Sequence, residues 1–487
     1  MKKFYKATVV MGLSTFVAMF IGLLRAKFIA LTLGPHGTGI FSQAMTFFQS
    51  AETICGLGIG IGIVKYVSEA WQKHDMNAAK STIFVSFILQ GVSFSLFFIL
   101  VCVFSGNLSQ FLFSTAKYSK LLIVVSGGVL FSILLISLES TLLGMARPDV
   151  FSKSRVVYYS AGFVSLVLLV GALKLNGGFI YIAANAAISF LIVCAFVIYM
   201  LRTKIKTSVS GFFKSFKHVN FRPYLKKLFS YGTVMLVSSA ITWITVLYVR
   251  SILIKECGAE VNGFYQVAFA LVGYFSPFFT NGFWGYLLPK LSAGKSASSL
   301  NAEINKAARF ILIFLVPLLA LLFLLKSQLV ITIFSKKFLP ALEIFPLYLL
   351  GSLFFMISYM LGVTFLARKK LNVYFSIGIL QNLAYALLFT ILVRKMGFLA
   401  IAVSYLATNI LACLVSGMYQ VKKMKLVFNR QNVRLFIAGI IFIGAVFFIP
   451  LGPGVDFVVK GIFLICWFLF AVGKKEKALL RSFLRPR

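Results

Sequence analysis

The sequence has little of what enzymes usually need. Its 487 residues include only 11 Asp and Glu and 3 His. None of the histidines, His36, His74 and His218, is near a plausible combination of partner acid and nucleophile. General acid–base catalysis and metal binding both depend on clusters of such side chains. We therefore do not expect an enzyme, and we expect neither a metal nor a cofactor.

Disulfide frameworks and separate soluble domains are also missing. The 6 cysteines include no CxxC pair and fall inside apolar segments or at their edges. Paired or metal-binding cysteines show regular close spacing instead. No hydrophilic stretch is long enough to fold as a domain of its own. The cysteines are therefore interpreted as small hydrophobic residues.

What the sequence has in excess is apolar residues. They make up 60% of the chain, well above the apolar fraction of soluble domains. The mean hydropathy is +0.97. A bilayer span needs about 20 mostly apolar residues, and fully apolar, Phe- and Leu-rich runs indicate helices rather than a β-barrel. We expect an all-α polytopic membrane protein with about 14 spans. The expected spans are 8–33, 38–63, 81–105, 120–145, 154–173, 179–201, 228–254, 263–288, 307–326, 341–366, 371–393, 397–420, 433–450 and 455–472.

The net charge of +37 would suggest nucleic-acid binding in a soluble protein. Here, however, alternating loops place about three quarters of the 48 Lys and Arg on the side of the N-terminus, as the positive-inside rule requires. We therefore expect both termini in the cytoplasm of a bacterial cell, with the chain in the cytoplasmic (inner) membrane. The charge then reflects topology, and nucleic acid is not an expected partner.

An internal repeat accompanies these spans. A shift of 224 residues lays "LGPHGTGIFSQA" (33–44) over "CGAEVNGFYQVA" (257–268) and aligns Gly39 with Gly263. Six spans separate the two copies, so both enter the membrane from the same side, which is typical of parallel transporter repeats. The sequence thus favours two pseudo-symmetric six-helix lobes around a central cavity. A chance likeness of two Gly-containing hairpins is the alternative.

The repeat divides the chain into four expected parts. Residues 1–201 would form an N-lobe and residues 228–420 a C-lobe, each of six spans. The basic segment 202–227 would connect them, either as an amphipathic helix on the inner leaflet or as a solvated linker. Residues 421–487 would add an extra helix pair and a basic cytoplasmic tail.

Three stretches resemble a known family: "LGPHGTGIF…GIGIGIVKYVSEA" (33–70), "WGYLLPKLSAGKS" (284–296) and "SKKFLPALEIFPLYLLG" (335–351). They are similar to motifs of the Wzx-type lipid-linked oligosaccharide flippases (O-antigen and other polysaccharides) of the MATE-like MOP exporter superfamily, and the likeness covers roughly residues 8–420. The resemblance implies a two-lobe transporter that moves undecaprenyl-pyrophosphate-linked oligosaccharide from the inner to the outer leaflet by alternating access. Membrane lipids and the polymerase and chain-length machinery of the same pathway would be its partners.

Cations inside spans are the first candidate substrate contacts. Arg25 lies about 12 Å from the outer end of its span, too deep for easy snorkelling. Its planar guanidinium group can donate two parallel hydrogen bonds to phosphate oxygens. The resemblance supports it, because related flippases often hold an arginine at this place. Arg250, nearer the outer end of its span, would be its counterpart in the other lobe. Lys27, on another face of the helix, and Lys65, at an inner span end, are further candidates, with snorkelling and topology as their alternatives.

Two acids also fall within spans, Glu52 and Glu139. Intramembrane carboxylates are functional candidates by default. Glu52 could carry a coupling proton or sodium ion, or could form a structural pair with Arg25. Glu139 could share such a role or reach the inner interface.

Alternative functions remain open at the level of the sequence. A small-molecule or drug exporter of the same superfamily would usually carry more acids in its lobes than this chain does. A lipid II-type flippase is a further alternative. A membrane polymerase or ligase usually needs a large outer loop, and the expected outer loops are short.

Overall fold

The computed structural model shows helices and no strand in the part of the chain that it describes. Most of the basic connection 202–227 and most of the expected last span 455–472 lie outside the described residues. The described residues are 2–200, 221–293, 297–449, 459–462, 467 and 471.

The chain divides into two compact units, each with its own core. The first comprises Met1–Gly263 with Ile333–Ser335, and the second comprises Phe264–Thr332 with Lys336–Arg487. The seventh expected span thus packs with the first unit, although the repeat assigns it to the C-lobe. The lobe boundaries expected from the repeat remain a prediction.

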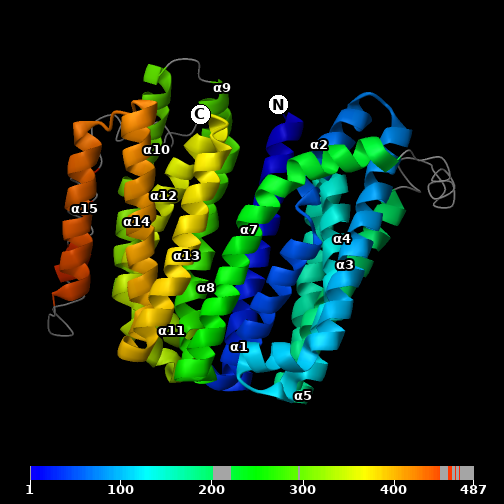
Figure 1. Ribbon diagram of the computed structural model, residues 1–487, viewed down its shortest axis with the longest axis horizontal. Coiled ribbons are helices and arrows are strands. Elements are labelled where there is room, and N and C mark those ends of the chain that lie inside the picture. Colours follow the sequence, from blue (N-terminus) through cyan, green and yellow to red (C-terminus); the bar gives the residue numbers. More distant parts are fainter. Residues whose placement is uncertain are drawn as a thin grey trace. The chain divides into compact units, whose positions relative to one another are not determined.

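The helices of the first unit are labelled in Figure 1, and several exceed the length of one span. Within this unit α5 packs against both α1 and α4, and α7 packs against α1, α2 and α3. The helices are α1 (Lys2–Cys55), α2 (Ile59–Gln72), α3 (Met76–Phe113), the short η1 (Ala116–Tyr118), α4 (Ser119–Gly144), α5 (Pro148–Met200) and α7 (Phe221–Cys257).

Two of these helices are bent. α5 covers the expected spans 154–173 and 179–201, and α1 covers 8–33 and most of 38–63, whose last residues lie beyond a break at 56–58, in α2. In α1 the backbone turns at Gly34, where φ is 65° and ψ is −175°, a conformation that glycine adopts readily. Pro35 follows directly and suits the first turn of a new helical segment. In α5 the backbone turns at Lys174, with φ at 52°. Gly177 then lets the chain pass close to the backbone of Leu169.

Two apolar clusters form the core of the first unit. One surrounds Phe48, Val125 and Phe179 on α1, α4 and α5. The other surrounds Ile63 on α2 and Leu142 on α4, and includes Leu228 of α7. Both clusters hold α4 at the centre, so polar side chains on α4 are surrounded by other helices.

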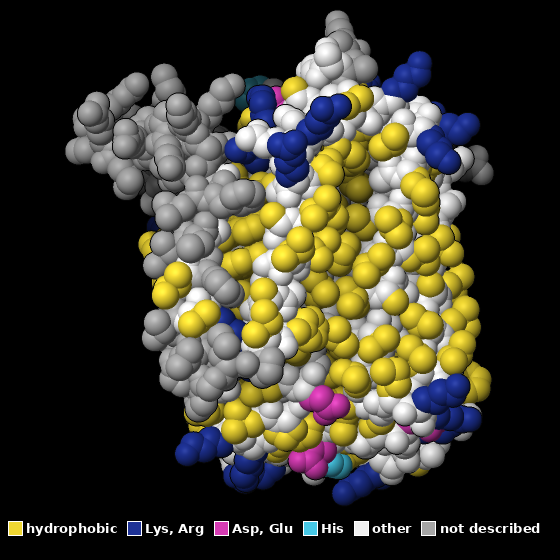
Figure 2. Space-filling model, turned by 90° about the vertical axis from the view of Figure 1, so that its left-hand side faces the viewer, with side chains coloured by type: hydrophobic (Ala, Val, Ile, Leu, Met, Phe, Trp, Pro, Cys, Tyr) yellow, Lys and Arg dark blue, Asp and Glu magenta, His cyan; other side chains and the backbone are white. Residues whose placement is uncertain are grey.

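The second unit repeats the pattern of packed apolar helices. Figure 2 views the face that carries α15, where apolar side chains fill the middle and Lys and Arg gather at the two ends. This distribution suits a bilayer. The elements are α8 (Ala259–Gly282), the π-helical turn η4 (Phe283–Leu287), α9 (Leu288–Ala293), α10 (Ala297–Leu324), α11 (Lys326–Ile333), η5 (Lys336–Glu343), α12 (Phe345–Ala367), α13 (Leu371–Met396), α14 (Leu399–Met424) and α15 (Arg430–Phe448).

Ten of the described helices are long and apolar enough to cross a membrane. Because α5 holds two expected spans and α1 holds one and most of another, these helices account for all the expected spans except 263–288 and 455–472. The first of these corresponds to α8 and the following short helices, which are less apolar. The expectation of an all-α polytopic membrane protein is thus confirmed.

Candidate functional site

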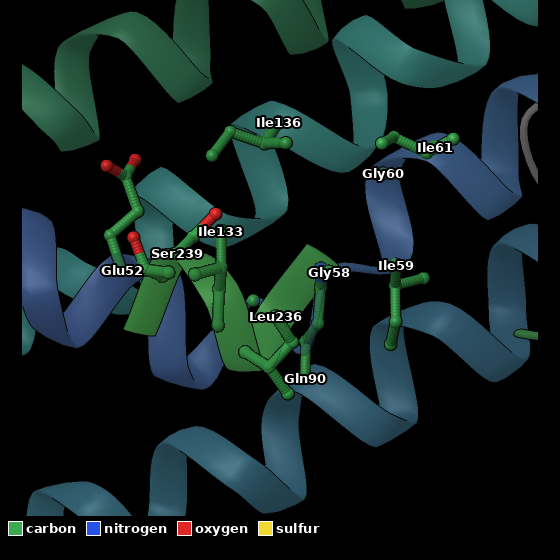
Figure 3. Close-up of a pocket in the computed structure, with 12 residues that line it drawn as sticks. Glu52, Gly58, Ile59, Gly60, Ile61, Gln90, Ile133, Ile136, Leu236 and Ser239 are labelled. Atoms are coloured by element: carbon green, nitrogen blue, oxygen red, sulfur yellow. The ribbon is translucent and has the colours of Figure 1, made fainter. Parts of the chain in front are cut away.

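A pocket inside the first unit is lined by residues of α1, α2, α3, α4 and α7. Its volume is about 280 Å³. Glu52 and Ser239 lie at one side of it and Gly58 to Ile61 at the other, as Figure 3 shows. The break between α1 and α2 therefore opens a space beside an intramembrane carboxylate.

The polar groups of this pocket bond to α4. Ser132 donates a hydrogen bond from Oγ to Glu52 Oε1. Gln90, only 1% exposed, accepts one from Ser137 Oγ at 2.8 Å. Among the described residues no ion pair is recorded for Glu52. A carboxylate with a neutral partner is well placed to take up a proton or a small cation, and this is the chemistry that the pocket offers.

A second polar cluster joins α4 and α5. Tyr158 donates from its hydroxyl to Glu139 Oε1 at 2.9 Å, and Arg155 Nε lies 4.0 Å from the same oxygen. Arg155 also donates from Nη2 to the Tyr159 hydroxyl at 2.9 Å. Glu139 is therefore held within the helix bundle by a phenol and a guanidinium, where a charge needs such partners.

Arg25 joins this cluster from α1. Its Nη2 donates to the backbone carbonyl oxygen of Tyr159 at 2.9 Å, and its guanidinium carbon lies 5.6 Å from the centre of the Tyr159 ring. Arg155 approaches the same ring at 5.4 Å. Two guanidinium groups thus lie against one tyrosine ring, and Glu139 lies beside one of them.

Polar capacity remains beside Arg25. Among the described residues, its buried Nε has no hydrogen-bond acceptor, and the buried Oδ1 of Asn185 has no donor. Both side chains border Gly162 so closely that a Cβ there would collide with them, at 2.5 Å from Arg25 Nη2. A donor and an acceptor that are both unsatisfied suit a polar ligand or water.

Arg250 has a different environment. It is 0% exposed, and its Nη1 donates to Ser42 Oγ and to Asn262 Oδ1, each at 3.0 Å. Asn262 in turn donates to the carbonyl oxygen of Gly39 at 2.7 Å. This position favours a structural role, in which Arg250 ties α7 to α1 and to the start of α8. A substrate contact at Arg250 remains a prediction.

The other predicted cations are less enclosed. Lys27 is partly exposed on α1, two residues beyond Arg25. Lys65, on α2, has its Nζ 5.2 Å from the centre of the Tyr66 ring. The proposed pairing of Glu52 with Arg25 finds no support in the recorded contacts, because each has another partner.

Sequence reasoning missed Arg155, Tyr158, Tyr159 and Asn185. Arg155 stands at the edge of an expected span, so it counted only as a loop cation. The available signal was the spacing, since Arg155 and Tyr159 are four residues apart and face each other on one helix. Nothing in the sequence connects Asn185 with Arg25.

Comparison with known proteins gives a family match over more than half of the chain. The model of a family described as "Polysaccharide biosynthesis protein" matches residues 4–257. The lipid III flippase of Escherichia coli (strain K12) is 23% identical over 410 residues, which cover 83% of this chain and 95% of that protein.

Solved structures show the fold. A lipid II flippase MurJ in an inward closed conformation gives a TM-score of 0.68 at 18% identity, covering 98% of this chain and 100% of that one. An inward-facing multidrug resistance MATE family transporter of the MOP superfamily gives a TM-score of 0.67 at 14% sequence identity. The alignment covers 86% of this chain and 99% of that one. These matches show that the chain shares the fold of these two proteins. With the fold of MOP superfamily transporters and a family match across its first half, the chain belongs to the polysaccharide biosynthesis protein family.

Proposed function

We propose that this protein flips undecaprenyl-pyrophosphate-linked oligosaccharide from the inner to the outer leaflet of the bacterial cytoplasmic membrane, for the synthesis of a surface polysaccharide. Residues 1–201 and 228–420 would act as two six-helix lobes that alternate access, with both termini in the cytoplasm. The family match and the alignment with a lipid III flippase along most of both chains support this function.

The observation that carries the proposal is the setting of Arg25. Moving a pyrophosphate and many sugar hydroxyls through hydrocarbon costs several kcal/mol for each unpaired polar group. Arg25 is held at the middle of a span by Tyr159 and keeps an unsatisfied Nε beside Asn185. A guanidinium in that state can bind phosphate oxygens, and the Asn185 amide can bond to a sugar hydroxyl or to phosphate.

The driving force need not come from a coupling ion. The electrical free energy of each elementary charge that crosses the membrane changes by about 2.3 kcal/mol per 100 mV of membrane potential. Since the cell interior is negative, an anionic head that moves outward goes downhill. Glu52, in its own pocket with Ser132 as partner, is the acid we propose for any coupling proton or sodium ion.

The test measures the appearance of a lipid-linked oligosaccharide in the outer leaflet of proteoliposomes, detected with a lectin that cannot enter them. Arg25→Ala should lower the initial rate about tenfold or more, because hydrogen bonds to charged groups contribute about 1.5–3 kcal/mol. Arg25→Lys should recover part of the rate. Lys153→Ala, at an exposed lysine of α5, is the control and should transport nearly as fast as the unchanged protein.

Three outcomes would speak against the proposal. Full transport by Arg25→Ala would remove this residue from the mechanism. Equal transport of lipid II would indicate a lipid II-type flippase. Transport of a cationic drug, without any glycolipid movement, would indicate a drug exporter of the same superfamily.

A further inference from the structure

A second pocket lies in the second unit, far along the sequence from the Arg25 cluster. Its volume is about 300 Å³, and residues of α10, α12, α14 and α15 enclose it. Its walls are apolar apart from Asn432. They include Leu312, Met360, Cys413, Gly417, Phe428 and Phe436.

This pocket opens on the lipid-facing surface. Three residues that line it, Leu414, Met418 and Val433, are 56%, 53% and 43% exposed. At one end stands Asn432, which is 5% exposed and donates to the carbonyl oxygen of Asn305 at 2.8 Å. A hydrocarbon chain in the bilayer can therefore enter from the side without displacing a polar contact.

Cations follow the pocket residues in the sequence where α14 passes into α15. Leu414, Met418 and Lys422 are spaced four residues apart on α14, so they share one face of the helix, and Lys422 lies one turn beyond the pocket wall,. The segment 399–449 contains no Asp or Glu. Further exposed cations in this segment are Lys423, Lys425, Arg430 and Arg434.

We propose that this pocket binds an anionic glycerophospholipid of the surrounding membrane. One acyl chain would fill the apolar space beside Gly417, and the phosphate would lie against Lys422 and the neighbouring cations. Basic groups at the mouth of an apolar space between helices attract anionic headgroups. An apolar space alone would accept any hydrocarbon chain, so the charge complementarity is what selects this lipid.

Gly417 allows a direct test of the acyl chain. A Cβ on Gly417 would have no atom within 4 Å, so the side chain of Gly417→Leu starts in open space at the wall of the pocket. Gly444→Leu is the matched control, because Gly444 lies on α15 outside the pocket and has equally open space. Phosphatidylglycerol retained by the purified protein is counted by native mass spectrometry, with the elution profile as the check of folding.

We expect Gly417→Leu to reduce the retained phosphatidylglycerol at least fivefold, and Gly444→Leu to leave it unchanged. Should Gly417→Leu fail to fold, phosphatidylglycerol with a photoactivatable acyl chain is cross-linked to the unchanged protein. The cross-link should map to residues 413–418. Equal retention by Gly417→Leu and the control, or cross-links spread evenly over the helices, would overturn the proposal.

The headgroup is tested through Lys422. Lys422→Gln should lower the preference for phosphatidylglycerol over phosphatidylcholine about fivefold, which corresponds to about 1 kcal/mol for one charge near a membrane surface. Lys370→Gln, an exposed lysine before α13, is the control and should keep the preference. Equal binding of both phospholipids to the unchanged protein, or displacement of phosphatidylglycerol by undecaprenyl phosphate at equimolar amounts, would contradict the proposal.

Discussion

Gly39 on α1 and Gly263 on α8 lie in backbone contact: a Cβ built on Gly39 would stand 2.9 Å from the amide nitrogen of Gly263. A Cβ on Gly263 would stand 2.9 Å from the carbonyl carbon of Pro35. The internal repeat aligns these same two glycines. Close approach of two backbones leaves no room for side chains, so the contact gives a physical reason for glycine at both positions.

The first prediction concerns this contact. Gly39→Ala should lower the stability by about 1–3 kcal/mol, because the new methyl group meets the backbone of Ala259 and must displace it,. Thermal unfolding in detergent measures the change. Gly91→Ala, where a Cβ would have open space, should be neutral or more stable by up to about 1 kcal/mol, since alanine favours helix. Equal melting temperatures for both variants would show that the α1–α8 contact can relax.

The second prediction separates two roles of Arg250. Arg250→Met removes hydrogen bonds from Ser42 and Asn262 in a buried site, and should cost about 2–3 kcal/mol of stability. Transport per folded molecule should change little if the role is structural. Rates are therefore normalised to the folded fraction, measured by size-exclusion chromatography. A stable Arg250→Lys variant with no transport would instead support a substrate contact at this position.

The third prediction concerns Glu139. Tyr158→Phe removes the hydroxyl that donates to Glu139 Oε1, and should destabilise the protein by about 1–3 kcal/mol because a partly buried carboxyl group loses a hydrogen-bond partner,. Combined with Glu139→Gln, its effect should be smaller than in the unchanged background. A double-mutant cycle on thermal stability measures the difference. Strict additivity would mean that Tyr158 and Glu139 do not act together.

The fourth prediction concerns Glu52. Glu52→Gln keeps the volume of the side chain and its ability to accept from Ser132, so stability should change by less than about 1 kcal/mol. If Glu52 carries the coupling ion, transport driven by an imposed proton or sodium gradient should fall at least tenfold. Transport driven by membrane potential alone should persist. An unchanged response to both gradients would exclude Glu52 as the coupling acid.

Much of the fold could be predicted because its determinants are local. Length and apolarity identify spans one at a time, and the surplus of cations on alternate loops predicts orientation without any knowledge of packing. The joining of expected spans into the single bent helices α1 and α5 was not predicted. Turns as short as those at Gly34 and Lys174 keep helical hydrogen bonding on both sides.

The candidate site shows the limit of this reasoning. Arg25, Glu52 and Glu139 stand out in the sequence because charges are costly in hydrocarbon. Their partners do not, because Tyr159, Ser132 and Tyr158 are ordinary residues of a membrane helix. A pairing between helices depends on how the helices rotate and pack, which no single helix determines.

The sequence by itself determined that this chain is a helical membrane protein with charges at a few intramembrane positions, since hydrophobicity and charge act residue by residue. Only the tertiary structure decided what those charges do. It buries Arg250 between Ser42 and Asn262, whereas it leaves Arg25 only partly buried, bonded to the backbone of Tyr159 and close to Asn185. Both are arginines in apolar spans, and they differ because the packing of neighbouring helices encloses Arg250 completely and leaves Arg25 partly exposed.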